Sequence, residues 1–303
     1  MRIVFNFAKT GMANNGGTRT LVRCAEGLAA HGHHVIMFCG SPRYTWHKPE
    51  GLTFAWPHHP ECDVSIATGY GSWKSVASKH PCNQAYYVRG LELWSAREHE
   101  LLKSFKTIPN IFVNSEWLLK YMKKHGVEAT LQYSGMDTEW FMNTGHKRSG
   151  VGALRNNRHK TKREGDIDGL EKILGLDIQQ LNRHIKRPDS TTLNKWYNKL
   201  KVWFAPTELE GLHNPPMEAA LAGCALVCTD HKRSGMSDYA IHGKTALIYP
   251  ARDLEVAAKH VHTLLDSEDL RRDLNMGLVS LIHSKIGTRS QRMAEFADRL
   301  ARL

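Results

Sequence analysis

The sequence lacks any long apolar run. None of its apolar stretches approaches the roughly eighteen residues that a membrane-spanning helix needs. The chain enters directly into Met1–Phe5, MRIVF, without a signal-peptide pattern. These two absences argue against a membrane-spanning helix and against a secreted precursor. We therefore expect the protein to be made and kept in the cytoplasm.

Sequence patterns of metal and redox sites are also missing. The six cysteines form no C-x2-C pair, and the eighteen histidines contain no H-E-x-x-H frame. No G-x-G-x-x-G pattern follows the first apolar run, which disfavours a nicotinamide or flavin enzyme. We expect no metal site, and we expect the cysteines to be reduced thiols in apolar surroundings. They are Cys24, Cys39, Cys62, Cys82, Cys224 and Cys228.

Acidic residues are few relative to basic ones. The chain of 303 residues has 41 Lys and Arg against 30 Asp and Glu, a formal net charge of +11. Residues 145–202 hold 14 Lys and Arg but only 6 Asp and Glu, so this segment carries +8 of that total. Such a positive field favours a nucleotide diphosphate, an anionic membrane surface or a nucleic acid as partner. The alternative is a solvated basic face that maintains solubility.

The chain does contain enough apolar material, 41% of its residues, for two domains. Its start predicts a strand at 2–7, a helix at 18–30 and a strand at 34–39, which is the opening of a doubly wound α/β domain. Gly16 and Gly17 precede the helix and would let a phosphate or an acceptor approach the backbone. Further strands are predicted at 63–67, 84–88, 110–114 and 129–133, and further helices at 72–79, 95–105 and 116–125.

The most informative segment is Lys201–Asp230, KVWFAPTELEGLHNPPMEAALAGCALVCTD. Its apolar run at 202–205 predicts a buried strand, and the strand ends at a proline. After a loop, Pro215–Pro216 opens a helix, because proline is tolerated at the first helical positions. Gly223 ends this helix, and a second buried strand is predicted at 225–228. The segment is therefore a strand–loop–helix–strand unit.

Two carboxylates flank the start of the predicted helix. In a parallel sheet the loop and the helix N-terminus lie at the carboxyl edge, where α/β folds bind ligands. Glu210 in the loop and Glu218 in the helix can each accept hydrogen bonds from neighbouring hydroxyl groups. A sugar or a nucleoside is the ligand that this pair favours. The alternative is that both are solvated residues stabilised by the helix dipole.

The amino-acid sequence of this segment resembles that of a known enzyme family. Its letters EGLHNPPMEAALAGCALV resemble the E-x7-E segment of retaining glycosyltransferases of family 4, in which EGFGLPPLEAMACGCPVV is usual. The resemblance implies the α/β GT-B fold, with two Rossmann-like domains facing a cleft. It extends over most of the chain through Gly16-Gly17, His31–Val35, Phe112–Ser115 and Gly135–Phe141.

The resemblance also implies a domain division and a donor site. The first domain would span residues 1–145 on the acceptor side, the second 146–286 would bind a nucleotide-sugar, and a helix at 287–303 would cross back. In the family the second Glu binds the ribose and the first binds the donor sugar, whereas an Arg and a Lys five residues later reach the diphosphate. The donor residues carried over are Glu210, Gly211, Leu212, His213, Asn214, Glu218, Arg155, Lys160, Gly16, Gly17 and, for the base, Arg187.

Two features depart from the usual family pattern, and a third resembles a motif of metal-dependent GT-A transferases. Arg89, with Glu92 close by, occupies the place where many members carry a His, and we expect both on the acceptor side, with a structural Arg–Glu pair as the alternative. Residues 174–188 are short and polar where the family has a glycine-rich strand, which predicts a reduced second sheet. Asp166–Asp168 spells D-x-D, but a basic run precedes it, so we interpret these acids as the start of a helix.

The implied activity is sugar transfer from a UDP- or GDP-type donor with retention and without an obligatory metal or other cofactor. The acceptor is left open by the resemblance. One hypothesis is a cell-envelope glycan or lipid-linked saccharide, with the basic surface resting on the anionic lipid of the inner membrane face. The alternative is a phage-type DNA glycosyltransferase that modifies a hydroxymethylated base and uses the basic segment on duplex DNA. A third hypothesis is a non-catalytic sugar-nucleotide binding protein.

Overall fold

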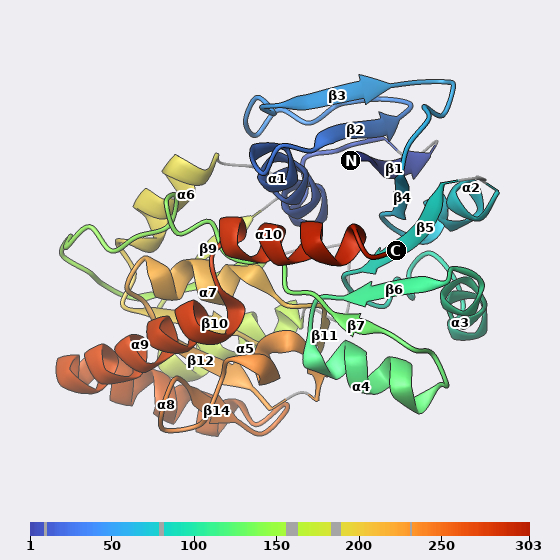
Figure 1. The fold of residues 1–303 in the computed structure, drawn as a ribbon. Coiled ribbons are helices and arrows are strands. Elements are labelled where there is room, and N and C mark those ends of the chain that lie inside the picture. The colour runs from blue at the N-terminus through green and yellow to red at the C-terminus, as the bar shows by residue number, and fades with distance from the viewer. Residues whose placement is uncertain (9–10, 79–81, 156–162, 183–188, 231) are drawn as a thin grey trace. The chain divides into compact units, whose positions relative to one another are not determined.

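The structure, a computed structural model, describes residues 1–8, 11–78, 82–155, 163–182, 189–230 and 232–303 (Figure 1). The chain divides into two compact units. Unit 1 comprises Met1–Gly135 together with Thr288–Leu303, and unit 2 comprises Met136–Gly287.

Unit 1 is built on a seven-stranded parallel sheet in the order β3-β2-β1-β4-β5-β6-β7 (Figure 1). The order reverses direction between β1 and β4, as in a doubly wound fold. The strands are β1 (Arg2–Ala8), β2 (His34–Cys39), β3 (Leu52–Ala55), β4 (Val64–Ala67), β5 (Asn83–Val88), β6 (Asn110–Val113) and β7 (Thr130–Leu131). The helices are α1 (Gly16–Ala30), the 3-10 turn η1 (Tyr70–Ser72), α2 (Trp73–Ala77), α3 (Glu98–Thr107), α4 (Glu116–Lys124) and α10 (Arg289–Leu300).

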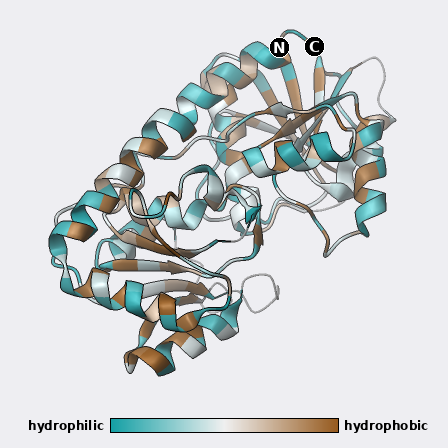
Figure 2. Ribbon diagram, turned by 90° about the horizontal axis from the view of Figure 1, so that it is seen from below, coloured by the Kyte–Doolittle hydropathy of each residue, from teal (hydrophilic) through white to brown (hydrophobic). Residues whose placement is uncertain are grey.

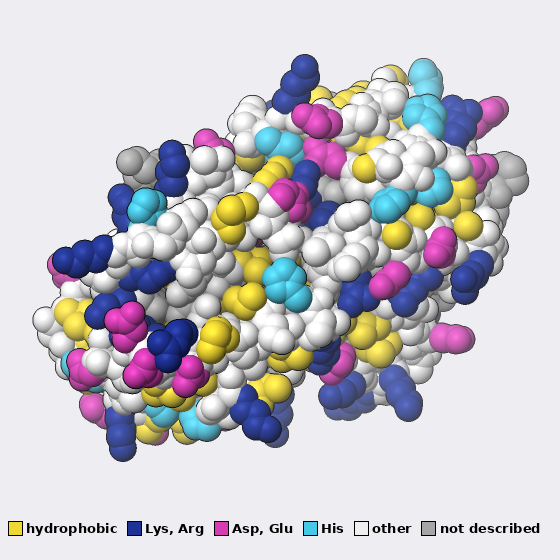
Figure 3. Space-filling view, turned by 60° about the vertical axis from the view of Figure 1, so that its left-hand side comes forward, with side chains coloured by type: hydrophobic (Ala, Val, Ile, Leu, Met, Phe, Trp, Pro, Cys, Tyr) yellow, Lys and Arg dark blue, Asp and Glu magenta, His cyan; other side chains and the backbone are white. Residues whose placement is uncertain are grey.

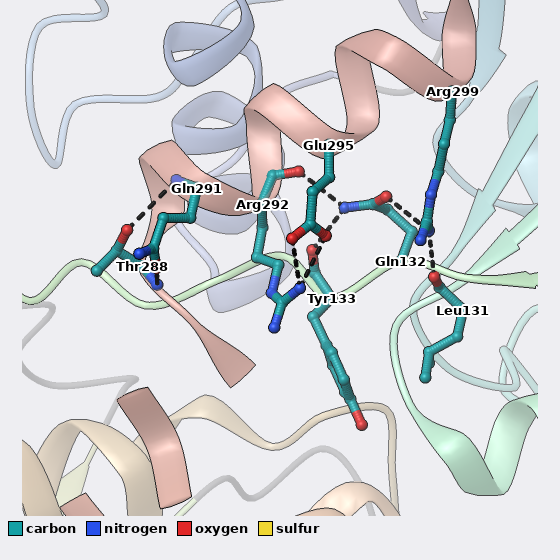
Figure 4. A network of polar contacts seen from close by, with 8 residues as sticks. All are labelled: Leu131, Gln132, Tyr133, Thr288, Gln291, Arg292, Glu295 and Arg299. Atoms are coloured by element: carbon teal, nitrogen blue, oxygen red, sulfur yellow. Dashed lines mark hydrogen bonds and ion pairs between the residues drawn. The ribbon is translucent and has the colours of Figure 1, made fainter. Parts of the chain in front are cut away.

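Helix α10 returns the chain to unit 1 and completes its core. Met293 and Phe296 are fully buried, and the Phe296 ring lies 5.0 Å from that of Phe112. A Cβ on Gly27 of α1 would lie 2.6 Å from the Met293 Cγ, so the glycine allows α1 and α10 to pack closely. Gln132 fixes the register of α10, because its Nε2 donates to the Arg292 carbonyl at 2.9 Å (Figure 4).

Unit 2 contains a five-stranded parallel sheet in the order β14-β12-β10-β8-β9. The order reverses between β8 and β10, which again is a doubly wound arrangement. The strands are β8 (Val151–Arg155), β9 (Ile178–Asn182), β10 (Val202–Ala205), β12 (Ala225–Thr229) and β14 (Leu247–Tyr249), with a two-stranded ribbon of β11 (Leu209–Glu210) and β13 (Arg233–Ser234). The helices are α5 (Glu164–Leu174), α6 (Ser190–Tyr197), α7 (Asn214–Leu221), the 3-10 turn η3 (Gly235–Asp238), α8 (Leu254–Asp266), α9 (Glu268–Leu281) and the π-helical turn η4 (Ile282–Ile286).

The central strands of both sheets are buried because apolar side chains line both of their faces. Val202 and Phe204 are fully buried in β10, as are Ile3 and Phe5 in β1. Parallel strands with helices on both faces require such continuous apolar runs. Figure 2 shows the apolar residues gathered on the strands.

The predicted elements that have strong boundary residues agree with the structure. Strands β2 and β10 span the predicted residues, and the predicted acids at 166–168 lie in the first turns of α5. The predicted helix at 18–30 begins earlier, at Gly16, because Asn15 caps it: the Asn15 Oδ1 accepts from the Thr18 N at 2.8 Å.

The structure differs from the sequence prediction at two sheet edges. Strand β9 lies within the polar segment 174–188, where no strand was predicted, so the second sheet keeps this strand. It lies at the end of the sheet order and pairs with β8; Ile178 is buried whereas Gln179 is exposed. Strand β3 was also missed and is likewise an edge strand, on which Phe54 is 42% exposed. One-sided burial removes the continuous apolar run that reveals central strands.

Candidate functional site

The loop that carries Glu210 is held firmly at the carboxyl edge of the unit 2 sheet. Glu210 ends β11 and pairs in parallel with Ser234 of β13. The Gly235 N then donates to the Gly211 O at 2.7 Å. A Cβ on Gly235 would lie 2.1 Å from that oxygen, so only glycine permits this approach. Glu210 itself is half-buried, and its main chain is fixed by its neighbours.

The turn from this loop into α7 has an unusual backbone. His213 adopts the left-handed conformation, with φ of 59°, and is followed by Asn214 as the first helical residue. The buried Tyr239 hydroxyl donates to the His213 carbonyl at 2.9 Å and stabilises the turn. Burial raises the pKa of Tyr239 well above its usual value, so the phenol remains a donor. The predicted residues 211–214 are therefore brought together on one preformed loop.

Glu218 lies one turn into α7 and is only 2% exposed. The Tyr197 hydroxyl of α6 donates to the Glu218 Oε2 at 3.3 Å. The alternative interpretation of Glu218 as a solvated helix-start residue is therefore wrong. A buried carboxylate has to be hydrogen-bonded, which makes it an oriented acceptor rather than a mobile surface charge.

Of the two cations predicted to reach a diphosphate, only one falls in the described structure. Arg155 ends β8, is half-buried, and contacts the Gln180 Oε1 through its Nε and the Asp168 Oδ1 through its Nη2. Lys160 and Arg187 lie outside the described residues. Arg155 is thus held at the carboxyl edge by a carboxylate that a phosphate group could replace.

Arg163, the residue before α5, is a half-buried bridge between two carboxylates. Its Nη2 lies 2.8 Å from the Asp166 Oδ1, and its Nε lies 3.4 Å from the Glu208 Oε1. The hydrogen bond to Asp166 raises the pKa of Arg163. On the other side, Arg252 Nη2 lies 3.9 Å from the same Glu208 oxygen. Sequence reasoning missed this cluster because its members come from three separate parts of the chain: the start of α5, the segment before β11 and the turn after β14.

A second arginine that sequence reasoning missed joins the ends of α6 and α7. Arg148 donates to the Tyr197 O at 3.4 Å, the Leu200 O at 3.2 Å and the Ala222 O at 2.5 Å. These carbonyls belong to helix C-termini, where a cation is favourable. Burial lowers the pKa of Arg148. The two helices are consequently tied together at the end opposite the Glu210 loop.

In unit 1, the predicted acceptor-side residues Arg89 and Glu92 follow β5 and bond to main-chain atoms of neighbouring segments. Arg89 donates through Nη1 to the Gly17 O and through Nη2 to the Thr68 O, each at 2.8 Å. The Glu92 Oε2 accepts from the Tyr70 N at 2.9 Å. Burial lowers the pKa of Arg89 and raises that of Glu92, and the charge of each opposes the shift of the other. Gly17 and Arg89 are thus in contact; Gly16 begins α1 beside them.

A separate polar chain fixes the loop between β2 and β3 onto α1. The buried Glu26 Oε1 lies 2.8 Å from the His47 Nε2, and the His47 Nδ1 lies 2.9 Å from the Tyr44 hydroxyl. The neighbouring Thr45 N donates to the Asn14 Oδ1 at 2.8 Å, which links this loop to the one before α1. The position of the Gly16-Gly17 turn therefore depends on both loops.

On the face in Figure 3, Lys and Arg side chains are interspersed with Asp and Glu side chains. Among the described residues, no three His, Cys, Asp or Glu side chains are grouped so as to hold a metal ion. In the same part of the chain, no helix is both long and apolar enough to cross a bilayer.

Residues 164–267, which lie in unit 2, match the model of the family described as glycosyl transferases group 1. The matched range includes Glu208, Glu210 and Glu218. A search of curated proteins gives no significant match. The family match confirms the prediction that the chain is a glycosyltransferase.

Solved structures resemble the whole chain at low sequence identity. Sucrose-phosphate synthase from Thermosynechococcus elongatus is 13% identical with a TM-score of 0.78, over 100% of this chain and 98% of that one. HepE from Anabaena in complex with UDP-glucose is 11% identical with a TM-score of 0.80, over 100% of both chains. WaaG, a glycosyltransferase involved in lipopolysaccharide biosynthesis, is 10% identical with a TM-score of 0.71, over 99% of both chains. The fold is therefore GT-B, as predicted.

Proposed function

We propose that this glycosyltransferase moves a sugar from a UDP- or GDP-type donor to an acceptor hydroxyl with retention of configuration. The observation that carries the proposal is the loop–helix segment of unit 2, in which Glu210 leads into a preformed turn and Glu218 is buried behind it. This segment lies within the range that matches the family. The complex of HepE from Anabaena with UDP-glucose supports a nucleotide-sugar donor.

Each donor residue has a role that suits its chemistry. Glu218 accepts hydrogen bonds from the ribose hydroxyls, and Glu210 with the main chain of 211–214 orients the transferred sugar. Arg155, together with Lys160, stabilises the diphosphate, where negative charge grows as the sugar leaves. Arg187 contributes to recognition of the base.

The proposed reaction needs no side-chain base. The bond from the anomeric carbon to the diphosphate oxygen breaks while the acceptor oxygen forms a new bond on the same face. The acceptor proton passes to the departing diphosphate oxygen, so atoms and charge balance without a further reactant. Fixed cations contribute most to such a step, because they stabilise charge without having to reorganise.

For the acceptor, we propose a cell-envelope glycan or a lipid-linked saccharide bound at the carboxyl edge of unit 1, beside Arg89 and Glu92. The likeness to WaaG supports this class. The net charge of +8 on residues 145–202 favours the DNA alternative instead. Co-sedimentation of the protein with anionic liposomes would support the glycan or lipid-linked acceptor. Salt-sensitive binding to duplex DNA would support the DNA acceptor.

Thermal stabilisation by a panel of nucleotide diphosphates and their sugars tests the donor site. A ligand at a hundred times its dissociation constant adds about 2.7 kcal/mol to the free energy of unfolding. Glu218→Gln and the double variant Arg155→Ala/Lys160→Ala should show much less of this effect, and Glu61→Gln, at an exposed carboxylate in unit 1, should keep it. If no member of the panel stabilises the wild type, two proposals fail: the transferase that uses a nucleotide-sugar donor and the non-catalytic sugar-nucleotide binding protein.

A further inference from the structure

Tyr197 stands in a rigid aromatic cluster within unit 2. It is the final residue of α6 and is fully buried. Its ring centroid lies 5.2 Å from that of Trp203, 5.4 Å from that of Trp196 and 6.1 Å from that of Phe141. Aromatic contacts from three sides leave a ring little freedom to change rotamer. The direction of the Tyr197 hydroxyl is therefore set by packing.

The backbone of Tyr197 is fixed as firmly as its ring. Its carbonyl accepts from the Arg148 Nη1 at 3.4 Å and from the Cys224 Sγ at 3.2 Å. Arg148 simultaneously bonds the carbonyl of Ala222, the residue that follows α7. The ends of α6 and α7 are thereby joined through one guanidinium group. Tyr197 cannot shift relative to α7 without breaking these bonds.

The hydroxyl held in this way meets the carboxylate of Glu218. The Tyr197 oxygen lies 3.3 Å from the Glu218 Oε2, and both residues are buried, at 0% and 2% exposure. A carboxylate oxygen has more than one lone pair, so a phenol on one side still leaves acceptor capacity for other hydroxyl groups. The phenol therefore helps to set the direction in which the remaining lone pairs of Glu218 point.

We propose that Tyr197 is a positioning residue that orients the Glu218 carboxylate and so sets the preference of the donor site for ribonucleotides over 2′-deoxyribonucleotides. This inference rests on the proposed role of Glu218 as the ribose ligand. An oriented carboxylate rejects a ligand that lacks a hydroxyl partner, because a buried acceptor is then left unpaired. A carboxylate that can rotate finds another partner, and discrimination falls.

The test compares the binding of UDP with 2′-deoxy-UDP, and of GDP with 2′-deoxy-GDP, by isothermal titration calorimetry on the full chain. We expect the wild type to prefer the ribonucleotide by roughly tenfold, which corresponds to one hydrogen bond to a charged group. In Tyr197→Phe the ring packing remains, and the preference for the ribonucleotide should fall to about threefold or less. The fall should come mainly from tighter binding of the deoxyribonucleotide, because the carboxylate can then turn to another partner when the 2′-hydroxyl is absent.

Tyr87→Phe is the matched control, because Tyr87 is also fully buried and donates one hydrogen bond, to the Gln132 O at 2.9 Å, but lies in unit 1. It should keep the full preference. The double variant Tyr197→Phe/Glu218→Gln should show the same preference for the ribonucleotide over the deoxyribonucleotide as Glu218→Gln alone. An unchanged preference in Tyr197→Phe, or additive effects in the double variant, overturns the inference while leaving the donor site intact. Absence of nucleotide binding in the wild type overturns the proposed function as well.

Discussion

The carboxyl edges of the two sheets are organised by different kinds of interaction. In unit 1, Arg89 and Glu92 bond main-chain atoms, namely the carbonyls of Gly17 and Thr68 and the amide of Tyr70. In unit 2, Arg155 and Arg163 bond carboxylates of other side chains. Unit 1 thus uses its charged residues to shape loops. Unit 2 pairs its charged residues with one another, and we propose that an incoming anion displaces the carboxylates.

Solvent exposure accentuates this difference. The Asp168 carboxylate, which faces Arg155, is 50% exposed, and Glu208 beside Arg163 is 25% exposed. Water and salt screen such pairs, so each contributes little to stability. Burial instead shifts the pKa of Arg89 and Glu92, which identifies that pair as desolvated. The comparison therefore predicts that arginine substitutions in the two units affect different properties.

Arg89→Met should have the largest effect on stability. Two carbonyls lose their donors and Glu92 loses its neighbouring cation, so we expect about 3 kcal/mol less free energy of unfolding. Urea unfolding followed by tryptophan fluorescence measures the change. Arg97→Met, at an exposed position, is the control and should stay within about 0.5 kcal/mol. A loss below about 1 kcal/mol for Arg89→Met would show that main-chain anchoring does not hold this edge.

Arg155→Met should mainly affect ligand binding. We expect a nucleotide diphosphate to bind roughly tenfold to a hundredfold more weakly, because one charge-assisted bond to phosphate is lost. Stability should hardly change, since Arg155 faces an exposed carboxylate. Titration calorimetry measures the affinity, with Lys195→Met as an exposed cation from the same basic segment. An equal loss in Lys195→Met would mean that the general field, rather than Arg155, attracts the phosphate.

Arg163→Met should cost an amount of stability that depends on salt. We expect about 1 kcal/mol at low ionic strength, because the bridge to Asp166 and Glu208 is only half-buried. Raising sodium chloride from about 0.05 M to about 0.5 M should remove most of this cost. The cost of Arg89→Met should remain the same over that range. If salt reduces both costs equally, the proposed contrast between the units does not hold.

Asp168→Asn should improve anion binding slightly. Removing the carboxylate that pairs with Arg155 leaves this cation free for phosphate, so nucleotide diphosphates should bind about threefold more tightly. The comparison variant is Asp177→Asn, an exposed acid in the same unit. Weaker binding in Asp168→Asn would indicate that Asp168 orients Arg155 for phosphate and does not compete with it.

Glu92→Gln should produce the smallest effect, visible as a pH dependence. Burial raises the pKa of Glu92, although the hydrogen bond from Tyr70 and the charge of Arg89 oppose the shift. Such a carboxyl contributes stability below its unfolded pKa and loses it as pH rises through its folded pKa. The variant should therefore gain stability relative to the wild type as the pH rises above the ordinary Glu value of 4.5. Urea unfolding at several pH values measures this.

The sequence was most informative where boundaries are marked by special residues. The unit from β10 to β12 could be predicted because an apolar run ends at Pro206, prolines open α7 and Gly223 closes it. Strand β9 was missed because buried Ile178 is followed by exposed Gln179, and strand β3 because none of its four residues is buried. A continuous apolar run therefore identifies central strands, and the same criterion overlooks edge strands, which lack such a run.

The candidate site was only partly predictable for a different reason. Single residues such as Glu210 and Glu218 stand in a recognisable pattern, but their partners come from distant parts of the chain. Tyr197 lies 21 positions from Glu218, and Arg89 lies 72 positions from Gly17. No local pattern contains such pairs. The burial of Glu218 and the bridging role of Arg163 therefore required the fold.

The return of α10 to unit 1 affects the order in which the molecule can be completed during synthesis. Residues 288–303 follow all of unit 2 in the chain, yet Met293 and Phe296 belong to the core of unit 1. A ribosome thus delivers the seven strands of the first sheet long before it delivers the helix that covers them. Unit 2, which is continuous, can finish folding while the core of unit 1 is still open. Unit 1 is therefore the first unit to be synthesised and the last to complete its core.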